Sequence, residues 1–106
     1  MMDLSINKKI FKENLNCKNY SNCIYMLDEE IKEMLILLIR GFNKNYVYKN
    51  LDDLKNNCLK YLDYDQKLLV LEFYDISMNP VNEIQELKQL LKIYDELNKS
   101  HIDLNN

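Results

Sequence analysis

The chain has 106 residues, of which 47% are apolar and 29% charged, and its formal net charge at pH 7 is −3. That length suits one domain around one hydrophobic core, and the apolar content is typical of a folded chain rather than a disordered one. The negative charge argues against broad phosphate binding, which needs clustered Lys and Arg, so a nucleic-acid-binding regulator is disfavoured.

The first expected element is an N-terminal helix at residues 1–18. Asp3 or Ser5 is suited to its N-cap, because short polar side chains accept hydrogen bonds from the first backbone N–H groups of a helix. Its apolar positions share one helical face: Ile6, Ile10, Phe11 and Leu15. Residues 1–20 carry four Lys against two acids, which fits a local basic patch or, as the favoured interpretation, a solvated helix face. The Asn-rich residues 14–22 predict a turn.

A longer helix is predicted to begin near Asn19 or Ser21 and to end at Arg40, before Gly41. Its apolar stripe has helical spacing: Cys23, Ile24, Leu27, Ile31, Met34, Leu35 and Leu38. Residues 42–49 predict a loop. A third helix opens at Asn50, with Asp53 three residues later in a capping arrangement. Its stripe consists of Leu51, Leu54, Cys58 and Leu62.

A break at residues 63–65 precedes a fourth helix, because Asp residues favour caps and turns. The core positions of this helix are expected to include Leu68, Leu69, Phe73 and Ile76. Asn79 ends the helix, since a residue before proline is pushed out of the α region, and Pro80 suits the first turn of the next helix. The inner side of the last helix is predicted to hold Val81, Ile84, Leu87, Leu91, Tyr94, Leu97 and Ile102.

Together these elements predict an all-α fold, a single compact bundle of four to five helices in which residues 20–103 form the bundle core of one domain, 1–106.

No signal peptide is expected, because charged residues interrupt every apolar run near the start. The longest apolar stretch, residues 34–39, is too short to span a bilayer. Three Cys without a C-x-x-C pair predict free thiols in a reducing cytosol, and therefore a soluble, cytoplasmic protein without a membrane partner. The sequence is rich in Asn, Lys and Ile, whose codons are AT-rich, and this composition favours a bacterial source with an AT-rich genome.

No complete catalytic, metal or cofactor motif is present, so the chain is predicted not to be an enzyme and to bind no cofactor. The only His, His101, is interpreted as a solvated residue near the chain end, and one His cannot supply the paired Glu-x-x-His units of a di-iron bundle. Gly41 is the only glycine, which excludes a glycine-rich phosphate loop. An activated thiol at Cys23, near a helix start, would reopen the question of catalysis.

Residues 26–97 have an order of features seen in a known superfamily. A helix containing MLDEEIKEMLILLIRGF is followed by NLDDLKNNCL, by a helix ending in LEFYDISMNP, and by a last helix after the proline. This order resembles the HEPN superfamily of small helical bundles. Ribonuclease members carry an Arg closely followed by a His, whereas here Arg40 and His101 are separated by most of the chain. The resemblance implies a bundle that lacks this active site and acts by binding, commonly as a dimer.

The leading hypothesis is a non-enzymatic helical interaction protein that acts by protein–protein binding or dimerisation, with a homodimer as the expected assembly. The second and fourth helices carry more apolar residues than a core of this size is expected to bury. The candidate partner-binding residues are Leu37, Ile39, Tyr46, Tyr48, Val70, Leu71 and Tyr74. One alternative is a toxin–antitoxin, immunity or phage-defence component with a degenerate HEPN-like fold. The other, a nucleic-acid-binding regulator, is weakened by Asp52 and Asp53 on the third helix.

Overall fold

The structure is a computed structural model that describes residues 8–105. Its helices are α1 (Lys8–Asn16), α2 (Tyr20–Arg40), α3 (Leu51–Tyr61), α4 (Tyr64–Met78) and α5 (Glu83–Asn105). No strand occurs within the described range, and the predicted all-α bundle is confirmed.

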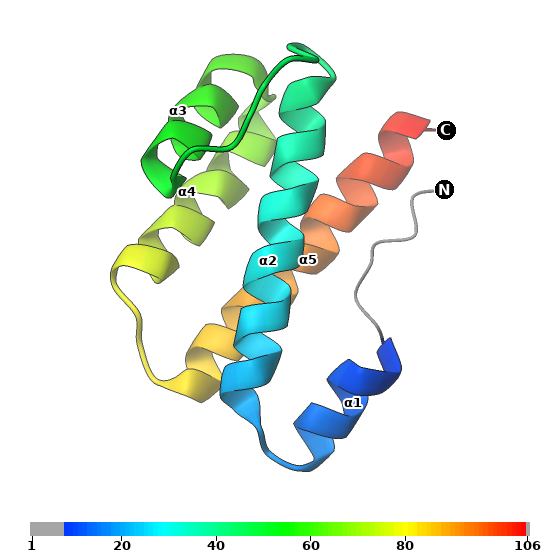
Figure 1. The fold of residues 1–106 in the computed structure, drawn as a ribbon, viewed down its shortest axis with the longest axis vertical. Coiled ribbons are helices and arrows are strands. Elements are labelled where there is room, and N and C mark those ends of the chain that lie inside the picture. The colour runs from blue at the N-terminus through cyan, green and yellow to red at the C-terminus, as the bar shows by residue number, and fades with distance from the viewer. Residues whose placement is uncertain (1–7, 106) are drawn as a thin grey trace.

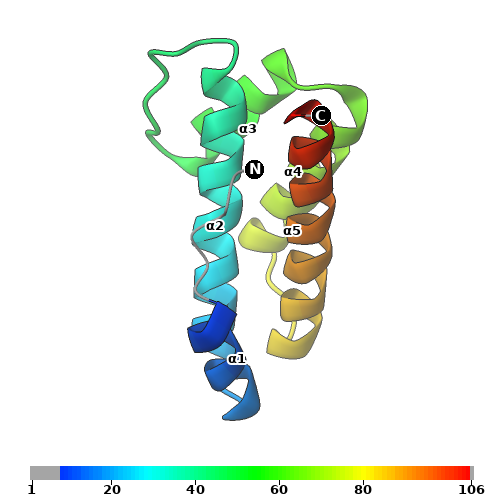
Figure 2. The ribbon, with the colours of Figure 1, turned by 90° about the vertical axis from the view of Figure 1, so that its right-hand side faces the viewer.

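Four of the helices form a closed ring. α2 and α5 lie side by side and make the most extensive pairing, α3 packs on α2 and α4, and α4 packs on α5 (Figures 1 and 2). α1 lies outside this ring, and within the described residues it packs on α2 alone. Among the described helices α1 alone packs on a single neighbour, which leaves part of the bundle surface beside it uncovered.

Local capping sets the helix boundaries in the middle of the chain. The Asn50 side chain accepts a hydrogen bond from the Asp53 backbone N–H at 2.8 Å, as the sequence predicted. At the predicted break, Asp63 and Gln66 form a reciprocal capping box, in which each side chain accepts from the backbone N–H of the other. The two caps satisfy backbone donors that a helix start would otherwise leave free, so α3 and α4 start where these polar residues stand.

The predicted role of Pro80 as the first turn of the last helix is wrong. α4 ends at Met78, as expected from Asn79-Pro80, but α5 begins only at Glu83. The Asn82 side chain accepts from the Gln85 backbone N–H at 2.9 Å, and this bond places the N-cap at Asn82. Pro80 therefore belongs to the connection between the two helices.

The Asn-rich turn between α1 and α2 is built around one side chain. Asn14 Oδ1 accepts hydrogen bonds from the side-chain amides of Asn19 and Asn22, at 3.2 and 3.3 Å. Lys18 has a φ of +57°, the left-handed conformation common where a helix ends. The chain thereby reverses within residues 17–19. The predicted N-cap at Asp3 or Ser5 and the apolar position Ile6 lie outside the described residues.

The core runs along the inside of the four-helix ring. The α2 and α3 stripes are buried largely as predicted, although Ile24 and Leu51 are only half-buried. The predicted inner faces of α4 and α5 need correction, because Leu68 and Ile84 are exposed while neighbouring positions are buried. The buried apolar residues of these two helices are Val70, Phe73, Ile76, Leu87, Leu90, Ile93 and Leu97. Phe73, Ile76, Leu87 and Leu97 are buried as predicted. Leu69, Leu91 and Tyr94 are only half-buried, and Val81 is exposed in the connection before α5.

Candidate functional site

The seven residues proposed from the sequence as a partner-binding set do not form one surface. Ile39 and Val70 are 0% and 2% exposed, and Tyr46 is 7% exposed, so these three belong to the core of the monomer. Leu37, Tyr48 and Tyr74 are half-buried, and only Leu71 is exposed. This corrects the expectation that all seven are available to a partner: a buried side chain contacts its own chain instead.

Tyr46 and Tyr74, two tyrosines of that set, make hydrogen bonds within the monomer. The Tyr46 hydroxyl donates to Asp53 Oδ2 at 3.0 Å, and the Arg40 Nε donates to the Tyr46 carbonyl oxygen at 3.1 Å. The pKa of Tyr46 is raised, first by burial and then by the hydrogen bond to Asp53. The Tyr74 hydroxyl donates to Asp52, and Lys55 Nζ lies 4.1 Å from the centre of the Tyr74 ring. These contacts attach the connecting loop and α4 to α3.

The clearest surface feature is an apolar groove between α1 and α5, which we call the α1–α5 groove. It has a volume of about 660 Å³. Its lining residues come from α1, α2 and α5: Lys9, Phe11, Lys12, Leu15, Leu27, Leu91, Tyr94 and Asp95. Its size is within the range of ligand-binding clefts in proteins, roughly 300–1,000 Å³.

The groove exists because α1 covers only part of the apolar surface beside it. Phe11 is half-buried against the core, and the Cys23 thiol donates weakly to the Phe11 carbonyl oxygen at 3.8 Å. Leu15 stays 36% exposed, and Leu91 and Tyr94 of α5 are half-buried. These side chains are apolar on both walls, yet neither wall closes over the other, so an apolar occupant would remove further surface from water.

The sequence placed Leu15, Leu91 and Tyr94 in the interior and did not predict the groove. The spacing of these residues assigns them correctly to inward-facing sides of their helices. It contains no information on whether the helix opposite is close enough to cover them. The expected first helix, residues 1–18, is longer than the described α1, which has nine residues and is therefore only about 14 Å long.

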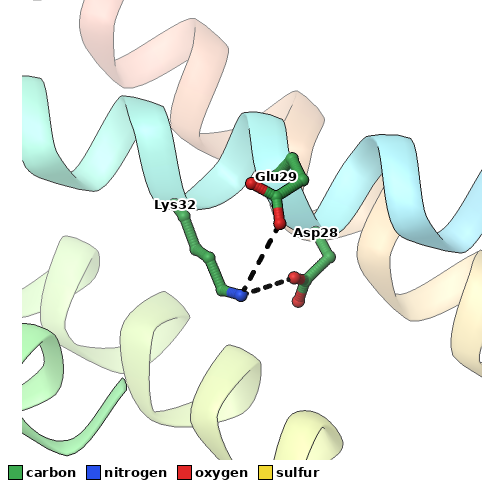
Figure 3. A network of polar contacts seen from close by, with 3 residues as sticks. All are labelled: Asp28, Glu29 and Lys32. Carbon is green, nitrogen blue, oxygen red and sulfur yellow. Dashed lines mark ion pairs between the residues drawn. The ribbon is translucent and has the colours of Figure 1, made fainter. Parts of the chain in front are cut away.

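A second, polar cleft of about 440 Å³ is lined by residues of α2, α3, α4 and α5, and we call it the Lys32 cleft. Lys32 Nζ lies 2.8 Å from Asp28 Oδ2 and 4.0 Å from Glu29 Oε1, all on α2 (Figure 3). Partial burial on its own lowers the pKa of the Lys32 ammonium. The hydrogen bond and charge of Asp28, with the charges of Tyr48 and Glu29, outweigh burial and raise that pKa above its usual value. Lys32 therefore stays protonated and neutralises the acids beside it.

Glu86 faces the same cleft, and its pKa is raised by burial and by the charges of Asp28 and Glu83. Because the folded protein binds this proton more tightly than the unfolded chain does, stability falls as pH rises through the raised pKa. We expect Glu86→Gln to increase the free energy of unfolding at pH 7 by less than about 1 kcal/mol. The gain should shrink at pH 4, where Glu86 is protonated in the parent protein.

Thermal unfolding followed by circular dichroism at both pH values measures this difference. Glu96→Gln, an exposed substitution on the same helix, is the matched control for the change in net charge. An equal gain from both variants at pH 7 would mean that net charge, and not the setting of Glu86, is responsible.

The Cys23 thiol, which the sequence left open as a catalytic candidate, is part of the hydrophobic core. Cys23 is fully buried, and burial raises its pKa; burial also raises the pKa of Cys58 to about 12. Since the thiolate is the nucleophile, neither of these two cysteines is activated by its surroundings. The side chain of His101 lies outside the described residues. Among the side chains that the structure does describe, no cluster of three or more His, Cys, Asp or Glu could hold a metal ion.

The described residues form a small helical bundle with an open apolar groove beside α1 and a polar cleft at Lys32. No helix within residues 8–105 combines the length and the apolar character needed to cross a membrane. Comparisons with protein-family models, with curated proteins and with solved structures give no match.

Proposed function

We propose that this chain is a non-enzymatic interaction protein that binds a helix of a protein partner in the α1–α5 groove. The observation that supports this proposal is the combination of apolar walls with an open mouth between two helices. Binding of an amphipathic helix along a hydrophobic groove is a recurring mode of peptide recognition. The partner is either a second copy of the chain, giving the predicted homodimer, or a different protein.

The arrangement of the walls suits a helix better than an extended strand. α1 and α5 both flank α2, and Leu27 of α2 lines the groove between them. Packed helices lie about 8–10 Å apart, so a helix in this position could contact both walls at once. A strand would instead need an exposed sheet edge for its backbone hydrogen bonds, and the described residues contain no strand.

A model peptide tests whether the groove accepts a helix. The probe is a fluorescent amphipathic peptide of about 18 residues, with Leu along one helical face and Gln elsewhere, a length at which isolated helices begin to form. Fluorescence anisotropy should show binding to the parent protein and at least tenfold weaker binding to Leu91→Asp, because the carboxylate would be desolvated in the groove.

Ile84→Asp is the matched control, since Ile84 is an exposed apolar residue of α5 outside the groove. It should bind the peptide as the parent protein does. Sedimentation across a concentration series decides separately whether a second copy is the partner: a dimer should dissociate in Leu91→Asp and persist in Ile84→Asp. Binding or dimerisation that is indifferent to Leu91→Asp would contradict the proposal.

A narrower hypothesis concerns the biological setting. A HEPN-like bundle without the ribonuclease motif could act in a toxin–antitoxin, immunity or phage-defence pair, as a bacterial cytoplasmic protein. The acidic balance of residues 51–78, six acids against three Lys, favours a partner with a basic surface in such a pair. A neighbouring gene for a nucleotidyltransferase or a toxin would support this setting, and co-purification of the two products would test it.

A further inference from the structure

The two walls of the α1–α5 groove differ in charge. α1 contributes Lys9 and Lys12 to the lining, whereas α5 contributes Asp95. From residue 9 to residue 18 the chain has three Lys and a single acid, Glu13. A basic wall is a local exception in a chain whose net charge is −3. Lysines beside an apolar groove cover its edge with their methylene stems and keep the ammonium group at the rim.

We propose that the occupant of the groove is an amphipathic helix of a different protein, whose apolar stripe is flanked by acidic residues on the side that faces α1. This inference rests on the proposed function, because it names the partner of the same groove. Acidic residues on that flank would lie opposite Lys12 and Lys9, and complementary charge favours one partner and its orientation over others.

The same charges favour an acidic helix over a second copy. In a two-fold symmetric dimer the groove of one copy faces the groove of the other, so either α1 meets the equivalent α1 or each α1 meets the α5 wall of the other copy. The first arrangement places Lys9 and Lys12 near the equivalent lysines, and the second offers their two charges only one acid of the groove lining, Asp95. Like charges placed opposite each other oppose association, whereas an acidic helix meets no such repulsion.

The size of the charge effect can be bounded. Exposed ion pairs between long side chains contribute modestly, and two such pairs give about a tenfold difference in dissociation constant. The effect should weaken as salt is raised, because the Debye length falls from about 10 Å at 0.1 M to about 3 Å at 1 M ionic strength. The contribution of the apolar stripe should change much less over the same range.

Two flanked peptides provide the test. Both keep the Leu stripe and length of the neutral probe, but one carries Glu along one flank and the other carries Lys there. We expect the parent protein to bind the Glu peptide about tenfold more tightly than the Lys peptide at low salt. The double variant Lys9→Glu, Lys12→Glu should reverse this preference. Lys44→Glu, Lys49→Glu makes the same change in net charge on the exposed loop between α2 and α3, and should preserve it.

The remaining outcomes separate this inference from the proposed function. Equal binding of both peptides, abolished by Leu91→Asp, would leave a helix-binding groove but overturn its acidic partner. A dimer of the free protein that Leu91→Asp dissociates would assign the groove to a second copy and also overturn the inference. Tighter peptide binding by Leu4→Asp, Ile6→Asp would assign the groove to residues 1–7 of the chain itself, with the same consequence.

Discussion

Replacing Phe73 by Ala is expected to lower the free energy of unfolding by about 3–5 kcal/mol, the largest effect of any single substitution considered for this chain. Phe73 is 1% exposed and is the largest of the fully buried side chains. It lies on α4, which packs on both α3 and α5, so truncation leaves a cavity that several helices would have to close. Small domains have only about 5–15 kcal/mol of stability in total.

Urea denaturation followed by circular dichroism measures this change through the transition midpoint, and a slope equal to that of the parent protein shows that the surface exposed on unfolding is unchanged. Leu71→Ala is the matched control, because Leu71 is on the same helix but 44% exposed. It should change stability by less than about 1 kcal/mol. Equal losses from the two variants would show that the inner face of α4 has been assigned incorrectly.

Ile39→Ala is expected to cost about 2–5 kcal/mol of stability, although sequence reasoning placed Ile39 at an interface. Its side chain is fully buried in the core near the end of α2. The matched comparison is Leu37→Ala, since Leu37 is half-buried on the same helix and should cost distinctly less. Midpoints of urea denaturation give the two values.

The solution mass of Ile39→Ala adds a second readout. If Ile39 contacted a partner rather than its own core, the substitution would leave the stability of the monomer almost unchanged and weaken association instead. The core assignment requires the opposite pattern, which is a large loss of stability at every protein concentration.

The helix boundaries could be predicted from the sequence because they depend on local chemistry. Asn50 and Asp63 cap the helices that follow them through hydrogen bonds to residues three positions away, and Asn79-Pro80 stops α4 through the backbone of neighbouring residues. None of these effects requires knowledge of the tertiary fold. Pro80 was the exception, because a polar residue two positions later provides the stronger cap.

The buried faces of α4 and α5 were harder to predict for a different reason. Residues 68–71 are four consecutive apolar residues, and such a run satisfies several helical faces equally well. Which face is buried depends on the positions of α3 and α5, and the sequence does not state these positions directly. Val70 is buried and Leu68 exposed because the neighbouring helices lie on the Val70 side.

The partner-binding residues were predicted from the number of apolar residues on the second and fourth helices, without regard to how many helices pack on each. α2 packs on α1, α3 and α5, so it buries side chains around more than one face, and residues such as Ile39 are used within the monomer. The apolar surface that remains exposed lies elsewhere, in the groove beside α1 and on the outer face of α4. Predicting the groove would have required knowing that α1 packs on a single helix.

Because α1 packs on one helix and α5 on two, the α1 wall of the groove should open more readily than the α5 wall. Because α1 packs on α2 alone, its release would leave the packing among α2 to α5 in place and would expose less apolar surface than global unfolding does. The amide hydrogens of α1 should consequently exchange with solvent faster than those of α2 or α5. An occupant that contacts both walls would slow amide exchange in α1, because it would hold the α1 wall against the α5 wall.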